Sequence, residues 1–110
     1  MIEKIVLDYL KQSISAVYME VPREPPTTFV IIERTGGTET NRIRSATLAI
    51  QSYAGTLYEA ASLNETVKAL MDGITALPSV SSCDLNADYN YTDTASKRYR
   101  YQAVYNVVYF

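Results

Sequence analysis

The sequence predicts an α+β domain in which two helices pack on one face of a four-stranded, mainly antiparallel sheet. Residues 1–17 and 57–73 have apolar side chains at helical spacing. Four other segments alternate between apolar and polar residues or are rich in β-branched and aromatic ones. The chain has 110 residues, enough for one domain around one core, so residues 1–110 are assigned to a single domain.

The first predicted helix, residues 1–17, is amphipathic. Its polar side carries Lys4, Asp8, Lys11 and Gln12, and its apolar side chains are Ile2, Ile5, Val6, Tyr9, Leu10 and Ile14. This pattern favours a helix that covers a sheet. A membrane-surface or partner helix is the alternative, and the mixed charge of the polar side disfavours the membrane version.

Three prolines between residues 21 and 26 forbid a helix and predict an extended linker. The first strand is expected at residues 27–35. Its four consecutive apolar residues, 29–32, indicate that both of its faces are apolar.

A hairpin connects the first strand to the second. Residues 36–41 predict a turn or a longer hairpin loop, and residues 42–53 predict the second strand. The pair Gly36-Gly37 is not part of a phosphate loop, because no Gly-Lys-Ser/Thr follows and the next element is a strand.

The second helix, residues 57–73, begins directly after the second strand. Thr56 and Glu59 form a capping-box pattern at its start, and Gly73 and Pro78 are stop signals. Its apolar side chains are Ala60, Leu63, Val67, Leu70, Met71 and Ile74.

Two further strands complete the predicted sheet. Residues 79–91 contain the third strand, residues 92–97 form a polar loop, and residues 98–110 form the last and longest strand. A right-handed crossover through the second helix leaves room for the last strand between strands two and three. The predicted sheet order is therefore 1-2-4-3, with antiparallel neighbours.

Composition excludes several functional classes. The formal net charge is −2, which argues against long-range attraction to nucleic acid. The chain has one cysteine and no histidine, so it lacks an internal disulfide and the commonest general base and metal ligand. It has neither an apolar run of about 18 residues, the length that spans a bilayer, nor a visible secretory signal. No catalysis, cofactor, metal or membrane contact is expected.

Two sets of residues are candidates for chemistry. Asp84 and Asp88 would share one face of a regular strand, as a metal or acid–base pair requires, with Asp93 nearby. Asp-, Asn- and Ser-rich segments also form turns and solvated surfaces, which is the favoured interpretation. Cys83 has no histidine to activate it and is expected to be a small, semi-buried residue.

Five arginines lie at predicted strand ends, close to several of the ten tyrosines. These arginines are Arg34, Arg42, Arg44, Arg98 and Arg100. Basic groups beside aromatic rings are typical of single-strand nucleic-acid platforms, but the net negative charge disfavours that function. The alternative is a solvated or subunit-facing edge on which the arginines pair with acids such as Glu33 and Glu39.

One face of the last strand is rich in tyrosine, carrying Tyr99, Tyr101, Ala103, Tyr105, Val107 and Tyr109. Since both faces of the first and last strands are apolar or aromatic, the sheet face without helices would expose large side chains. Such a patch indicates either an interface or tyrosines that are partly hydrated.

The chain resembles tail terminator, or tail completion, proteins of long-tailed (siphovirus-type) bacteriophages and prophages. The resemblance begins at Val21-Pro22 and Pro25-Pro26 and is most specific over residues 33–37, Glu-Arg-Thr-Gly-Gly. It continues through Arg42-Ile43, residues 46–54 and the early alanines of the second helix, and it includes the tyrosine-containing last strand. Residues 78–97 match least.

The resemblance implies a structural virion protein without enzymatic activity. Members form a ring, usually a hexamer, on the head-proximal end of the tail. The ring caps the tube of major tail protein, stops its polymerisation and presents a surface to the head–tail connector. DNA passes through the lumen without specific binding, and assembly takes place in the host cytoplasm.

Two surfaces are predicted to contact a subunit or the tube. The first is the hairpin at residues 35–44 with the adjoining residues 33 and 34, and the second is the tyrosine face. The candidate contact residues are Glu33, Arg34, Glu39, Arg42, Arg44, Tyr99, Tyr101 and Tyr105. A head–tail connector or head-completion protein is the alternative within the same pathway. A small ligand- or nucleic-acid-binding module is the alternative from another class.

Overall fold

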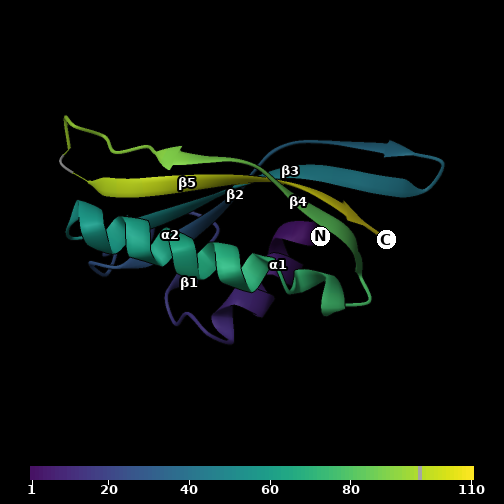
Figure 1. Ribbon diagram of the computed structural model, residues 1–110, viewed down its shortest axis with the longest axis horizontal. Coiled ribbons are helices and arrows are strands. Elements are labelled where there is room, and N and C mark those ends of the chain that lie inside the picture. Colours follow the sequence, from purple (N-terminus) through teal and green to yellow (C-terminus); the bar gives the residue numbers. More distant parts are fainter. Residues whose placement is uncertain (97) are drawn as a thin grey trace.

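The computed structural model describes residues 1–96 and 98–110 and has an α+β fold with two helices on a five-stranded mixed sheet (Figure 1). The elements are α1 (Ile2–Lys11), β1 (Val17–Tyr18), β2 (Phe29–Thr40), β3 (Ile43–Ala54), α2 (Leu57–Met71), the 3-10 helix η1 (Ile74–Ala76), β4 (Val80–Asn90) and β5 (Tyr99–Tyr109). The strand order is β1-β2-β3-β5-β4. The predicted placement of the last strand between the second and third predicted strands is confirmed.

The sheet has one strand more than predicted. β1 pairs in parallel with β2, at Val17–Val30 and Tyr18–Ile31, whereas the other neighbours are antiparallel. The first helix is correspondingly shorter than the predicted range of residues 1–17 and ends at Lys11. The apolar residues after Lys11 instead serve other contacts: Ile14 packs against the core, and the β-branched Val17 enters the sheet.

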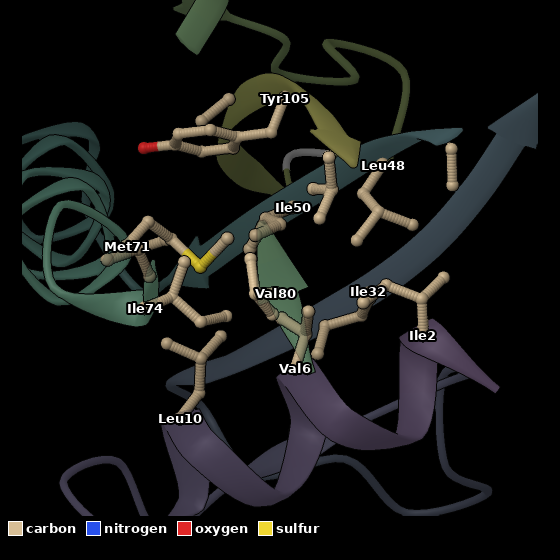
Figure 2. Close-up of a cluster of buried hydrophobic side chains, with 14 of the residues drawn as sticks. Ile2, Val6, Leu10, Ile32, Leu48, Ile50, Met71, Ile74, Val80 and Tyr105 are labelled. Atoms are coloured by element: carbon tan, nitrogen blue, oxygen red, sulfur yellow. The ribbon is translucent and has the colours of Figure 1, made fainter. Parts of the chain in front are cut away.

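Both helices lie on the same face of the sheet, as predicted (Figure 1). Ile2, Val6 and Leu10 of α1 and Val67 and Met71 of α2 are buried against the strands. Figure 2 shows the side chains of α1 and Met71 of α2 beside Ile32, Leu48 and Ile50 from the central strands. The regular alternation of β3 places Ala46, Leu48 and Ile50 in this core.

The hairpin differs from the prediction of a turn or loop at residues 36–41. β2 continues to Thr40, and only Asn41 and Arg42 form the turn. Both have positive φ values, 53° and 65°, as a tight two-residue hairpin turn requires. A bulge at Thr35, between Arg34 and Gly36, interrupts the pairing but does not end the strand.

The second helix begins as predicted. The Thr56 hydroxyl accepts a hydrogen bond from the Glu59 backbone N–H at 3.1 Å. The sequence pattern does not identify Asn64, which is buried with the apolar residues and donates a hydrogen bond to Asp88 of β4. The predicted polar loop at residues 92–97 includes Lys97, which lies outside the described residues.

Candidate assembly surfaces

The outer half of the β2–β3 hairpin forms an exposed arm, defined here as residues 34–44. Every residue of the arm is exposed, whereas the strand segments before and after it are mostly buried. Figure 1 shows the arm extending past the ends of both helices. The arm contains Arg34, Arg42, Arg44 and Glu39, four of the predicted contact residues.

A hollow of about 410 Å³ lies at the base of the arm. Its walls are Met1, Arg34, Gly37, Thr38, Glu39, Arg44 and Tyr109. The Arg44 guanidinium lies 5.2 Å from the centre of the Tyr109 ring, a cation–π contact. None of the ion pairs formed within the described residues involves an arginine, so the expected pairing with Glu33 and Glu39 is absent there. Two arginines therefore line the hollow without a carboxylate partner in that part of the chain.

The glycine pair of the arm positions Arg34. The Arg34 Nε donates to the Gly36 carbonyl at 3.3 Å, and the guanidinium crosses over Gly37. A Cβ atom at Gly37 would overlap that guanidinium and would lie 2.9 Å from the backbone oxygen of Ser45. At Gly36 a Cβ atom would meet nothing within 4 Å. Gly37 thus provides the space in which Arg34 lies against the hollow.

Acidic side chains lie around β4, the strand at the opposite edge of the sheet. This edge surface is defined here as Glu65, Lys68, Asp72, Asp84, Leu85 and Asp88 of α2, its C-terminus and β4. The Lys68 ammonium contacts Asp88 at 3.1 Å and Glu65 at 3.2 Å, and these hydrogen bonds raise the pKa of Lys68. The edge surface has four acids and one base, and its apolar residue, Leu85, is 43% exposed.

The acids of β4 do not form the metal or acid–base pair that regular alternation would produce. A bulge between Leu85 and Ala87 puts Asp84 opposite Asn106 on one face and Asp88 opposite Ala103 on the other. No group of three or more potential metal ligands occurs among residues 1–96 and 98–110.

The remaining two candidates for chemistry also have structural explanations. Asp93 accepts hydrogen bonds from the Ser96 hydroxyl and the Ala95 N–H, which lower its pKa and fix a turn. Burial raises the pKa of the half-buried Cys83 thiol to about 11, with Asp84 and Asp72 adding to the effect. The thiol is therefore protonated near neutral pH, which does not suit a nucleophile.

The uncovered face, the side of the sheet opposite the helices, carries a row of side-chain hydrogen bonds. Gln51 donates to Gln102 at 2.9 Å and to Glu33 at 3.4 Å, and Gln102 donates to the Tyr89 hydroxyl at 2.6 Å. Gln51 and Gln102 are only 7% and 8% exposed although no helix covers them. Glu33, a predicted contact residue, belongs to this row rather than to the hollow.

Apolar residues at one end of the uncovered face are more buried than expected. Phe29 and Tyr53 stack with ring centres 4.5 Å apart, and Ile31 lies beside them. Tyr18 of the unpredicted strand β1 packs against this cluster. The expected large exposed patch is therefore reduced by a strand that sequence reasoning missed.

The tyrosine face of β5 is turned toward the helices. Tyr105 is 2% exposed and belongs to the core shown in Figure 2, so its assignment to a subunit contact is corrected. Tyr99 is exposed and Tyr101 half-buried, at the end of β5 that pairs with Ala54 and Ser52. The arm adjoins the other end of β5, where Arg44 pairs with Tyr109. The structure therefore does not bring the two predicted surfaces together.

The arrangement predicted for a nucleic-acid platform is not formed by β5. Arg100 lies on the uncovered face, whereas Tyr99 and Tyr101 point to the helix-covered side. Arg100 instead donates to the Tyr53 hydroxyl at 2.7 Å and lies 4.5 Å from the centre of the Tyr91 ring. These contacts hold the arginine in the protein's own network.

No protein-family model matches the chain, and no curated protein matches it. No helix within the described residues is long and apolar enough to cross a membrane. The resemblance to tail terminator proteins therefore remains a hypothesis that depends on residues of the chain itself.

Proposed function

We propose that this chain is a structural protein of phage or prophage tail assembly, a tail terminator that forms a ring and caps the tail tube. The observation that carries the proposal is the arm, an exposed two-stranded projection with three arginines. Exposed groups on a paired hairpin are preorganised for contact, because little conformational entropy is lost when a partner binds. The sequence resemblance is most specific where β2 enters this arm.

The proposed mechanism is geometric rather than chemical. Copies join into a ring, one side of the ring binds the last layer of major tail protein, and the other side receives the head–tail connector. Cys83 is protonated, and Asp84 and Asp88 point to opposite faces, so neither of the two chemical candidates supports an alternative enzymatic function.

The test is to delete the gene from the phage or prophage that carries it and to examine tails by electron microscopy. We expect tubes of abnormal, extended length. Tails of normal length that fail to join heads would instead identify a head–tail connector. Tails of normal length joined to heads would contradict both assignments.

A variant carrying Arg42→Glu and Arg44→Glu is expected to leave overlong tails when it replaces the native protein, because it reverses the charge of the arm. The matched control is Lys11→Glu with Arg23→Glu, which makes the same change of charge at exposed residues outside the arm. Normal tails from the arm variant would remove the arm from the proposed mechanism. Circular dichroism of both purified variants checks that the fold is retained.

A further inference from the structure

The arm and the edge surface have opposite charge. The arm has three arginines and one glutamate, and the edge surface has four acids and one lysine. Burial raises the pKa of the Tyr105 hydroxyl, and the nearby carboxylates of Asp72 and Asp88 add to that effect. The chain therefore carries two complementary electrostatic surfaces of its own.

These two surfaces cannot meet within one folded chain. The arm is the end of β2 and β3, whereas the edge surface surrounds β4, and β5 lies between β3 and β4. A contact between them therefore needs two copies. Each copy has one arm and one edge surface, which is the condition for a head-to-tail interface, and such an interface forms a ring when the rotation between copies closes.

Both surfaces also have open backbone edges and an exposed apolar residue. β1 pairs only with Val30 and Ile31, so the outer edge of β2 in the arm is unpaired among the described residues, as is the outer edge of β4. Ile43 of the arm is 57% exposed and Leu85 of the edge surface is 43% exposed. Interfaces commonly combine apolar residues with charged ones around them.

Bulges limit what can pair with these edges. The bulge at Thr35 interrupts the ladder of β2, and β4 has irregularities near Ser81 and Asn86. Bulges discourage indiscriminate edge-to-edge pairing. Side-chain charge and the hollow at the base of the arm, rather than a long continuous ladder, are therefore suited to select the partner.

We infer that the arm of one copy binds the edge surface of a second copy, with acidic side chains of that surface placed against Arg34 and Arg44 at the hollow. This inference deepens the proposed function, and it depends on that function for its biological setting, because it names the two surfaces that close the ring. The occupant of the hollow is a second copy of this chain.

The test uses three purified full-length variants and sedimentation at low and high salt. The arm variant carries Arg34→Glu and Arg44→Glu. The edge variant carries Asp72→Lys and Asp84→Lys, two exposed acids without an ion pair in the described part of the chain. The third variant combines all four changes. Glu20→Lys with Glu24→Lys is the matched control for the edge variant, at exposed residues of the linker.

The native chain and the linker control are expected to self-associate at low salt and to separate at high salt, where charges are screened. The arm variant and the edge variant are each expected to self-associate at least about tenfold more weakly than the native chain, because like charges then face each other. An equimolar mixture of these two variants is expected to form mixed oligomers. The combined variant is expected to recover self-association, since its reversed surfaces again match.

Several results would overturn the inference. One is a native chain that remains monomeric at its highest soluble concentration. Another is an edge variant that self-associates like the native chain. A third is that neither the mixture nor the combined variant recovers self-association. Binding of nucleic acid to the arm in place of a second copy would also overturn the inference. It would be seen as salt-sensitive retention of labelled DNA that the arm variant loses.

This test is separate from that of the proposed function. Charge-swap recovery in solution together with normal tails after gene deletion would support the interface and contradict tail termination. Overlong tails after gene deletion together with no charge-swap recovery would support tail termination and place the arm against another partner.

Discussion

The inner and outer halves of the β2–β3 hairpin belong to the same two strands but are stabilised differently. The inner half has helices on one face, a hydrogen-bonded polar row on the other, and a strand on each side. In the outer half, the arm, β5 reaches only as far as Arg44, which pairs with Tyr109, and the residues farther out have only the pairing of β2 with β3 and a two-residue turn. The hairpin therefore changes along its length from a core element to a surface available for contacts.

The bulge at Thr35 marks the transition between the two halves. Before it, Ile32 and Val30 face the helices, and after it Gly37 and Glu39 take that side beside the hollow. The inner half is expected to determine stability, and the arm is expected to determine association. Ile50 and Ile43, and likewise Gln51 and Thr47, lie on opposite sides of the bulge, whereas Gly36 and Gly37 are neighbours on one side of it.

The largest difference is expected between two isoleucines of β3. Ile50 is fully buried between the helices and the sheet, and Ile50→Ala should lower the free energy of unfolding by about 2–5 kcal/mol through lost transfer energy and cavity formation. Ile43→Ala in the arm makes the same chemical change and should cost less than about 0.5 kcal/mol. Urea denaturation measures both, and Ile50→Val replaces Ile50→Ala if the latter does not fold. Equal costs would contradict the division of the hairpin into two halves.

A smaller difference is expected on the uncovered face. Gln51→Leu should destabilise the protein by about 1–3 kcal/mol, because the buried Gln102 carbonyl and the Tyr53 hydroxyl each lose a partner. Thr47→Val, nearer the arm, removes a hydrogen bond of 3.2 Å to the exposed Asn106 and should cost less than about 0.5 kcal/mol. The double variant Gln51→Leu with Gln102→Leu should cost less than the sum of the single changes, and additive costs would show that the row is not coupled.

Much of the inner half could be predicted from the sequence, because a strand with one face in the core carries apolar residues at every second position. The alternation of Ala46, Leu48 and Ile50 correctly placed β3, and the capping residue Thr56 correctly placed the start of α2. β1 was missed because two residues are too short to show a period. The unusual length of β2 was missed because exposed strands carry Thr, Gly and Glu, which are also typical of loops.

The candidate surfaces were predictable only in part, for a related reason. The charges of the arm are visible in the sequence, but their lack of acidic partners within the described residues depends on geometry. The bulge near Asn86 reversed the facing of Asp88, and periodicity alone gives no signal for a one-residue insertion. Tyr105 was assigned to a contact because the alternation separates the two faces of β5 but does not say which face the helices cover.

The smallest effects are expected at the two glycines that follow the bulge. Gly37→Ala should destabilise the protein by about 1 kcal/mol, because the new Cβ displaces the Arg34 guanidinium and presses on the Ser45 carbonyl oxygen, which moves only with its strand. Gly36→Ala has open space and no positive φ, so it should stabilise the protein by about 0.4–1 kcal/mol by restricting the unfolded chain. Denaturation measures the opposite signs, and amide chemical shifts at Ser45 report the strand movement. Stabilisation by Gly37→Ala would show that Arg34 does not lie over Gly37 in solution, and the position of Arg34 at the hollow would then need revision.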